Sequence, residues 1–327
     1  MKNCLLTGCA GFIGSNFVNY MAKKYHDTQF VVLDILDYCA SLENIDKNAN
    51  VEVIIGDIAN KELVRYILEK FQIDTVAHIA AQSSVDNSFY NSIAFTQTNV
   101  LGTHILLETI RIYHEKTGNI NKIFYVSTDE VYGENLNDKA MTETAIYAPS
   151  NVYSATKAAS ELIIMAYRQS YKLPILCSRG NNVYGKNQYP EKVVAKFICK
   201  LLNNEKLTIH GNGSSRRNFI HVDDTCTAFE TILMKGEIGE IYNISSAEHN
   251  EFNVMQIVEM LVELIHPGEE LDKYIEYVED RKFNDSRYYI SSEKLEKLGW
   301  KPVKTNFVEE LKELIEWYRV NKGRYGF

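Results

Sequence analysis

The chain has 327 residues, of which 45% are hydrophobic and 24% are charged, and its formal net charge is −8 with a sequence pI near 5.6. This composition is typical of a globular enzyme with a sizeable core, and it argues against a disordered or fibrous chain. The acidic balance argues against nucleic acid or an anionic membrane as the main partner, so an anionic ligand would need a locally basic pocket.

The first residues, MKNCLLTG, run directly into an apolar strand and lack the architecture of a signal peptide. No apolar run approaches the roughly 20 residues that span a bilayer. The six cysteines show no C-x-x-C pair, and the eight histidines show no H-x-H or H-x-x-x-H spacing. We therefore expect a cytoplasmic protein with reduced, buried thiols, no membrane partner and no metal.

Apolar strands alternate with amphipathic helical stretches from the first residue onward. Strands are predicted at 3–7, 29–35, 51–55, 74–80, 122–128 and 174–179. Helices are predicted between them at about 12–24, 61–71, 91–115 and 153–171. Because each parallel crossover needs a helix to return the chain, this alternation predicts an α/β protein with a Rossmann-type, doubly wound parallel sheet.

After about residue 185 the pattern loosens into shorter strands, loops and helices. These helices are predicted near 190–204, 224–234, 253–265, 292–298 and 305–321. We interpret this part as a smaller α/β substrate lobe that is partly interleaved with the first. The predicted first lobe covers residues 1–184, with 222–245 returning to it, and the second lobe covers 185–221 and 246–327.

Three glycines, Gly8, Gly11 and Gly14, lie between the first predicted strand and the first predicted helix as G-x-x-G-x-x-G. Glycine lets the backbone turn tightly and approach a pyrophosphate, which binds at the helix N-terminus where N–H groups are free. Turns collect glycine in any case, but the position between a strand and a helix makes this motif specific. We expect a dinucleotide here, with Phe12 and Ile13 beside it.

Asp34 ends the second predicted strand and is followed by Asp37. A carboxylate at this place accepts hydrogen bonds from the adenosine ribose and repels a 2′-phosphate, and no basic residue follows before Lys47. NAD is therefore favoured over NADP, although a polar strand end is the alternative interpretation of Asp34. Asp57 and Ile58, after the third strand, are expected at the adenine.

Tyr153 and Lys157 are four residues apart, so they share one face of the helix predicted at 153–171. A nearby cation favours the phenolate and is expected to lower the pKa of Tyr153, as is the positive nicotinamide of bound NAD⁺. Such a phenolate can take a proton from a sugar or alcohol hydroxyl while hydride leaves carbon. The pair alone occurs by chance in many helices, but downstream of a glycine-rich turn it is specific.

The strand predicted at 122–128 ends in Thr128-Asp129-Glu130. Adjacent acids at a strand end are often solvated loop residues or helix caps, so this octapeptide, VSTDEVYG, does not by itself indicate chemistry.

Several motifs along nearly the whole chain resemble those of the nucleotide-sugar 4,6-dehydratases, which are extended short-chain dehydrogenases/reductases that act on dTDP-glucose or UDP-glucose. The matching stretches are TGCAGFIGSNF, HIAAQSSVDNSF, VSTDEVYGE, YSATKAASE, RGNNVYGKNQYPEK, HGNGSSRRNFIHVDD, YNIS and RKFNDSRY. RGNNVYG and FNDSRY are closer to the UDP-sugar branch. The Thr-Asp-Glu triplet separates glucose-type dehydratases from related epimerases, which lack the acid pair, and from decarboxylases, which usually keep only the Glu.

The resemblance implies a role for each residue of the triplet and of the Tyr-Lys pair. NAD would oxidise the sugar C4 hydroxyl, with Tyr153 as the base, Lys157 beside it and Thr128 hydrogen-bonded to the C4 oxygen. Glu130 would then remove the C5 proton, and a protonated Asp129 would donate to the departing C6 hydroxyl. Burying two carboxyl groups side by side moves their pKa values apart, which allows one to act as acid and the other as base.

The resemblance also implies the remaining contacts and the assembly. The expected substrate-binding residues are Ser83, Ser84, Thr128, Asn182, Glu191, Lys192, Arg217, Asn243, Arg281, Asn284 and Tyr288. The expected further cofactor contacts are Ala80, Ala81 and Thr98. A homodimer is expected, in which the helices at about 91–115 and 153–171 pair across a two-fold axis into a four-helix bundle.

The chain departs from the usual S-H-V-D pattern, because it reads Ser83-Ser84-Val85-Asp86. The change is either neutral packing or an enlargement of the pocket for a bulkier C2 substituent, such as the acetamido group of UDP-N-acetylglucosamine. The presence of Asp-Glu rather than Asp-Lys after the threonine favours retention of the sugar configuration at C5, although it does not decide between retention and inversion.

Two alternative functions remain open from the sequence. A 4-epimerase or decarboxylase would make Asp129 a bystander. An NAD-binding sensor or scaffold would have no chemistry, but such chains typically lose the tyrosine or the lysine of the pair.

Overall fold

The computed structural model describes residues 1–135, 137–247, 250–279 and 285–327. Its largest element is a seven-stranded parallel sheet in the order β10-β6-β5-β4-β1-β2-β3. The strands are β1 (Asn3–Thr7), β2 (Gln29–Asp34), β3 (Val51–Ile55), β4 (Thr75–His78), β5 (Lys122–Thr128), β6 (Ile175–Gly180) and β10 (Ile241–Ile244). The predicted α/β class and parallel sheet are confirmed.

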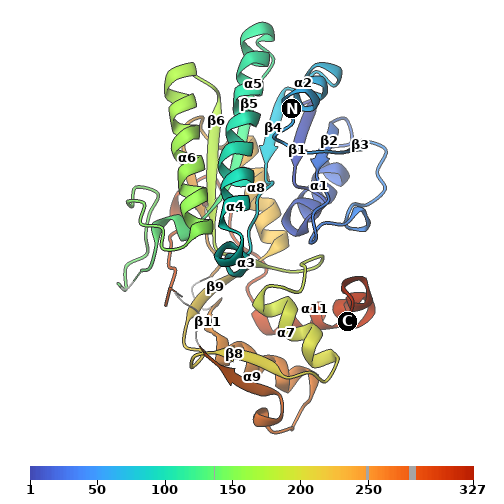
Figure 1. The fold of residues 1–327 in the computed structure, drawn as a ribbon, viewed down its shortest axis with the longest axis vertical. Coiled ribbons are helices and arrows are strands. Elements are labelled where there is room, and N and C mark those ends of the chain that lie inside the picture. The colour runs from blue at the N-terminus through green and yellow to red at the C-terminus, as the bar shows by residue number, and fades with distance from the viewer. Residues whose placement is uncertain (136, 248–249, 280–284) are drawn as a thin grey trace.

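Helices cover both faces of this sheet (Figure 1). The helices on the two faces are α1 (Phe12–Lys24) and α8 (Val222–Lys235) on one, and α2 (Lys61–Lys70), α5 (Thr103–Thr117) and α6 (Val152–Tyr171) on the other. Successive strand side chains point to opposite faces, so in β1 Cys4 and Leu6 pack with α1 and α8 while Leu5 packs with α2 and α5. This two-sided burial explains why the strands read as continuous apolar runs.

The helix predicted at 91–115 is interrupted in the structure. It consists of α4 (Ser92–Phe95), a π-helical stretch η2 (Thr96–Gly102) and α5. A Cβ added to Gly102 would lie 3.0 Å from Cδ1 of Ile58, so the wider turn ends where the chain passes close to the loop after β3. π-Helical stretches inside α-helices are often found at functional sites.

The remaining elements form the smaller part of the molecule, at the bottom of Figure 1. Its strands pair as β11-β9-β7 and β12-β8, and its core includes α7, α9 and α11. The bounds are β7 (Asn182–Tyr184), α7 (Val193–Leu202), β8 (Leu207–His210), β9 (Arg216–His221), β11 (Glu251–Asn253), α9 (Val254–Ile265), β12 (Ile275–Val278) and α11 (Phe307–Asn321).

Some features of this arrangement bear on the predicted lobes. The strand β10 joins the large sheet and α8 packs on α1, which supports the predicted return of 222–245, although the lobe boundaries stay a prediction.

The short helices α3 (Val85–Tyr90) and α10 (Glu293–Glu296) complete the fold, and α3 was not predicted. Within the described residues, no helix combines the length and apolarity needed to cross a membrane.

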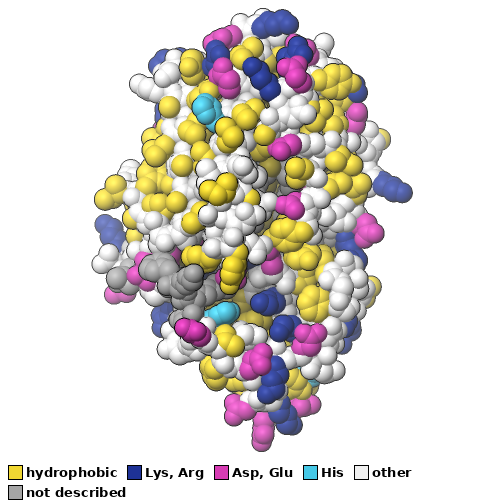
Figure 2. Space-filling model, viewed as in Figure 1, with side chains coloured by type: hydrophobic (Ala, Val, Ile, Leu, Met, Phe, Trp, Pro, Cys, Tyr) yellow, Lys and Arg dark blue, Asp and Glu magenta, His cyan; other side chains and the backbone are white. Residues whose placement is uncertain are grey.

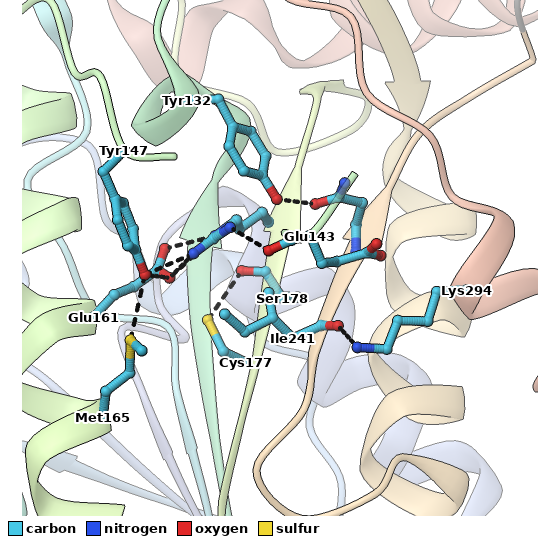
Figure 3. Close-up of polar contacts among 11 residues, drawn as sticks. Tyr132, Glu143, Tyr147, Glu161, Met165, Cys177, Ser178, Ile241 and Lys294 are labelled. Carbon is cyan, nitrogen blue, oxygen red and sulfur yellow. Dashed lines mark hydrogen bonds and ion pairs between the residues drawn. The ribbon is translucent and has the colours of Figure 1, made fainter. Parts of the chain in front are cut away.

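A buried ion pair joins the sheet to α6 (Figure 3). Arg179 of β6 donates to both carboxylate oxygens of Glu161, with a shortest contact of 2.7 Å, and both side chains are at most 2% exposed. The Arg179 guanidinium also donates to the Tyr147 hydroxyl at 2.7 Å and lies 4.6 Å from the ring centre of Tyr132. The pair therefore ties α6, β6 and the loop after β5 together.

Breaking this pair from one side should destabilise the fold. We expect Arg179→Met to lower the free energy of unfolding by about 3–5 kcal/mol, because Glu161 is left buried without its counter-charge. The double variant Arg179→Met/Glu161→Leu should recover most of that loss. Urea unfolding of the two variants and the wild type measures both values, and equal losses in the single and double variants would contradict this account.

Candidate active site

A cavity of about 820 Å³ lies at the carboxyl ends of the large sheet and continues into the smaller part of the molecule. It is lined by residues that follow β1, β2, β3, β4, β5 and β6, and by Thr208 of β8 and Arg217 of β9. In open parallel α/β sheets, ligands bind outside the carboxyl ends of the strands. The cavity therefore lies where the fold would hold a ligand.

The glycine turn after β1 forms one wall of the cavity. Gly8 has a φ of +74°, and a Cβ at this position would lie 2.5 Å from Cα of Ala80. The N-cap of α1 is Gly11, which makes no side-chain capping bond, so α1 presents free N–H groups. These features fit a pyrophosphate at the start of α1.

Asp34 lies beside this turn and is buried. Its Oδ2 accepts from the backbone N–H of Ala10 and its Oδ1 from that of Leu36, both at 2.8 Å. The carboxylate thus fixes the turn, and each oxygen keeps a second acceptor position for a ribose hydroxyl. Asp37 is exposed and accepts from Nε2 of Gln82 at 2.5 Å.

The structure brings the predicted cofactor residues together in this cavity. The lining includes Gly8, Gly11, Phe12, Ile13, Gly14, Asp34, Asp37, Asp57, Ile58, Ala80, Ala81, Thr98, Tyr153 and Lys157. Among the described residues, no group of three or more His, Cys, Asp or Glu side chains is placed to hold a metal ion.

The acid pair follows β5 directly, at the start of the 3₁₀ helix η3 (Asp129–Tyr132). Thr128 is its N-cap, and Oγ1 of Thr128 accepts from the N–H of Glu130 at 3.3 Å. Asn151 begins α6 with a capping box, and its Nδ2 donates to Oε2 of Glu130 at 3.1 Å. One asparagine therefore fixes both the start of the tyrosine helix and the Glu130 carboxylate.

Asp129 is 2% exposed, and its hydrogen-bond donors within the described residues are both neutral. Oγ1 of Thr128 donates to Oδ1 at 3.2 Å, and Nδ2 of Asn181 donates to Oδ2 at 2.7 Å. Burial, reinforced by the neighbouring Glu130, raises the pKa of Asp129 to about 7. A carboxyl group with this pKa is available as a proton donor near neutral pH.

Tyr153 and Lys157 face the same cavity from α6. Lys157 Nζ donates to the carbonyl of Val126 at 2.7 Å and lies 4.3 Å from the ring centre of Tyr125, and burial lowers its pKa to about 8. Burial, reinforced by Glu130, raises the pKa of Tyr153. The expectation that Lys157 lowers the Tyr153 pKa is therefore wrong for the protein alone, because desolvation prevails.

Most predicted substrate-binding residues also line the cavity. They are Ser83, Ser84, Thr128, Asn182, Glu191, Lys192, Arg217 and Tyr288. The guanidinium of Arg217 lies 4.6 Å from the ring centre of Tyr288, and Lys192 Nζ donates to the carbonyl of Ser83 at 2.8 Å. The hydroxyl of Ser84 is the N-cap acceptor of α3, from the N–H of Asn87 at 3.3 Å.

Comparison with known proteins places this geometry in a family. The sequence profile of the family described as GDP-mannose 4,6 dehydratase matches residues 5–314. The chain belongs to this family.

One relative, from Arabidopsis thaliana, is 45% identical over 99% of this chain. It is described as a trifunctional UDP-glucose 4,6-dehydratase/UDP-4-keto-6-deoxy-D-glucose 3,5-epimerase/UDP-4-keto-L-rhamnose-reductase. The chain spans about half, 48%, of the length of that relative. A dTDP-D-glucose 4,6-dehydratase of Mus musculus is 44% identical, over 98% of this chain and 89% of the mouse protein. The crystal structure of a Bacillus anthracis dTDP-glucose 4,6-dehydratase in complex with NAD matches with a TM-score of 0.89 and 36% identity, over 100% of this chain and 99% of that one.

One described residue that the family resemblance suggested as a substrate contact, Asn243, is not among the residues that line the cavity. Asn243 is fully buried in β10, where its Oδ1 accepts from the Tyr132 hydroxyl at 2.8 Å, so it is not among the lining residues (Figure 3 shows the surrounding network). In β10 it lies beside β6 and α10, and its role as a substrate contact stays a prediction. Arg281 and Asn284 lie outside the described residues.

Sequence reasoning missed other residues of the site within this family fold. The cavity is also lined by Tyr38, Asn151 and Asn181. The Tyr38 hydroxyl donates to Oε2 of Glu191 at 2.6 Å. The Asn-Asn pair after β6 could have indicated that Asn181 lies in the site. Neighbouring parallel strands end at the same edge of the sheet, so the residues that follow β5 and β6 lie close together.

The raised pKa of Asp129 predicts a pH-dependent stability. Ionisation is penalised in the folded state, so the penalty is absent below the ordinary value of 3.8 and complete above about 7. We expect Asp129→Asn to be more stable than the wild type above that pH, by about 1–3 kcal/mol, and to lose this advantage under acid. Urea unfolding across pH tests this, with the exposed Asp272→Asn as control; a pH-independent difference would refute it.

Proposed function

We propose that this protein is a nucleotide-sugar 4,6-dehydratase with NAD as its resident cofactor. The observation that carries the proposal is a buried carboxyl group, Asp129, whose pKa is raised to about 7, placed beside Glu130 in the same cavity as Tyr153. An epimerase or a decarboxylase needs no such proton donor. The names of the Arabidopsis and mouse relatives support the same reaction class.

The cofactor would be held by the glycine turn, with its pyrophosphate at the start of α1 and its adenosine ribose at Asp34. When bound, NAD supplies the redox chemistry by accepting hydride from the sugar C4 and returning it to C6. In this proposal the larger sheet part of the molecule, residues 1–184 with 222–245, binds the cofactor. The second lobe, 185–221 and 246–327, binds the nucleotide sugar.

Tyr153 and Thr128 would serve the oxidation at C4. The Tyr153 phenolate, which the positive nicotinamide of bound NAD⁺ would favour over the phenol, takes the C4 hydroxyl proton as the C4 carbonyl forms, and the Thr128 hydroxyl would turn its O–H from Asp129 to the same oxygen. Lys157, held on the carbonyl of Val126, fixes the face of α6 from which Tyr153 acts. The resulting ketone acidifies the neighbouring C5–H.

Glu130 and Asp129 would then eliminate water. Glu130 takes the C5 proton, and the electron pair of that C–H bond becomes the second bond between C5 and C6. The C6–O bond breaks at the same time, and its oxygen leaves as water with the proton of Asp129. Return of hydride to C6 and of a proton to C5 gives the 4-keto-6-deoxy sugar.

The substrate would be a nucleoside diphosphate hexose. Lys192 and Arg217 supply positive charge beside the cavity despite the acidic average of the chain. We propose UDP-glucose or UDP-N-acetylglucosamine ahead of dTDP-glucose, because RGNNVYG and FNDSRY are closer to the UDP-sugar branch. The acetamido variant of this proposal rests on Ser84, which replaces the usual histidine.

The product of each candidate substrate tests the proposal. Incubation with UDP-glucose, UDP-N-acetylglucosamine or dTDP-glucose should give, for one of them, a product lighter by one water with a new C6 methyl signal in the proton NMR spectrum. An unchanged mass with an isomerised sugar would identify an epimerase, and loss of carbon dioxide from a uronic acid substrate would identify a decarboxylase.

Removing the proposed proton donor should stop only the second half of the reaction. Asp129→Asn is expected to lower the rate of water loss roughly 10²- to 10⁴-fold, since it cannot donate to the leaving oxygen. C4 oxidation should persist and be visible as the near-ultraviolet absorbance of the reduced nicotinamide. Unaltered turnover of the variant would make Asp129 a bystander and favour the epimerase alternative.

We further propose a cytoplasmic homodimer joined through α4, η2, α5 and α6. Large hydrophobic side chains are exposed along these helices, including Ile93 (68%), Leu101 (51%), Leu162 (55%) and Met165 (45%). Figure 2 shows hydrophobic side chains interspersed over the upper part of the molecule, where Figure 1 places these helices. Several large hydrophobic side chains exposed on neighbouring helices are typical of a surface that another subunit covers.

Light scattering after size exclusion should give twice the chain mass of 37.5 kDa. Leu162→Glu is expected to shift the protein toward the monomer, because a charge would be buried at the interface. The matched control is Val320→Glu on α11, which is 83% exposed and lies outside these helices. A wild-type mass of one chain would disprove the dimer.

A further inference from the structure

Asn181 is brought to Asp129 by the register of two sheet strands. In the β5–β6 pair, Thr128 lies opposite Gly180, so the residues that follow these two strands are neighbours. Asp129 and Asn181 are those residues. Asn181 is 5% exposed and lines the cavity.

The contact between the two side chains is short and buried. Nδ2 of Asn181 donates to Oδ2 of Asp129 at 2.7 Å, whereas the other donor to this carboxyl group, Oγ1 of Thr128, is at 3.2 Å from Oδ1. Oδ1 of Asn181 is buried and has no hydrogen-bond partner within the described part of the chain. A buried amide oxygen without a partner is costly, so this position keeps an amide at the expense of stability.

We propose that Asn181 is a positioning residue of the dehydration: its amide holds the Asp129 carboxyl group in the orientation from which the proton passes to the departing C6 oxygen. This inference rests on the proposed function, in which Asp129 is the proton donor. It assigns a role to a side chain that does not itself exchange a proton.

An amide suits this role because it carries a donor and an acceptor. The Asp129 carboxyl group is protonated before water leaves and ionised afterwards. Nδ2 of Asn181 donates to the carboxyl group in the structure, a contact that suits the ionised form, and Oδ1, which has no partner within the described residues, can accept the O–H of the protonated form once the amide has turned over. The same side chain therefore keeps the carboxyl group in place on both sides of the proton transfer, with the stronger, charge-assisted bond to the ionised form.

Other charged and titratable groups also face Asp129 and enter any pH argument. Glu130 of η3 raises its pKa, whereas Arg217 of β9 and the donation from Asn181 lower it. Tyr153 of α6 also interacts with Asp129 electrostatically. Removing the Asn181 donor while keeping these groups should therefore raise the pH at which Asp129 loses its proton.

Asn181→Leu is the decisive variant, because leucine has the same branching at Cγ and neither donor nor acceptor. We expect water loss to slow roughly 10²-fold with KM changed less than about threefold, since the carboxyl group is present but no longer held in place. The basic limb of the kcat profile should move to higher pH. C4 oxidation should persist, so that reduced nicotinamide accumulates on addition of substrate.

Two further variants separate positioning from folding. Asn181→Ser keeps a donor and an acceptor and should restore part of the lost rate. Asn50→Leu removes another amide, one that donates to the carbonyls of Ala22, Tyr25 and Thr28 away from the cavity, and should change stability without moving the pH profile. If Asn181→Leu left both kcat and the basic limb unchanged, or slowed oxidation and water loss equally, the positioning role would be wrong.

A measurement without substrate separates this inference from the proposed function. Infrared titration of the protonated carboxyl band, with Asp129→Asn as the reference, reports the pKa of Asp129 in the wild type and in Asn181→Leu. A higher value in the variant supports the contact even if the wild type dehydrates none of the sugars tested, which would overturn the proposed function alone. An unchanged value overturns the contact itself.

Discussion

The register between β5 and β6 is the constraint on which the site depends. Both strands are parallel and end at the same edge, with Thr128 opposite Gly180, so the acid pair and the Asn-Asn segment meet there. The glycine turn after β1 and the aspartate at the end of β2 reach the same edge through the neighbouring strands. A one-residue slip would send the side chains of β6 to the opposite face of the sheet and remove Asn181 from Asp129.

Two buried carboxyl groups near this edge have opposite surroundings. Glu161 is paired with Arg179, whose guanidinium also contacts the Tyr132 and Tyr147 rings, so its charge is compensated inside the protein. In the described part of the chain, Asp129 receives hydrogen bonds from a hydroxyl and an amide, both neutral, and burial prevails and raises its pKa. A buried carboxyl group with a charged donor, such as Glu161, is structural. A buried carboxyl group with neutral donors, such as Asp129, is suited to proton transfer.

Local motifs could be predicted from the sequence, whereas contacts between distant segments could not. The strands, the glycine turn and the Tyr153–Lys157 pair follow from periodicity and spacing within a few residues, and the structure places these residues in one cavity. The burial of Asn243 depends on where β10 joins the sheet, and the raised pKa of Tyr153 depends on desolvation by the whole fold, so neither follows from a local pattern. The helix at 91–115 is interrupted by a π-helical stretch that ends at Gly102, close to Ile58, and no local pattern indicates this approach of distant segments.

The strand β6 serves as the common reference for the acid and the base of the proposed reaction. Residues two apart on a strand point to the same face, and Cys177 and Arg179 of β6 both contribute to the α6 side of the sheet, with Asn181 next in the series. Arg179 fixes α6 through Glu161, and α6 carries Tyr153; Asn181 holds Asp129 directly. Because both contacts start from one strand, the position of β6 bears on Asp129 and on the helix that carries Tyr153.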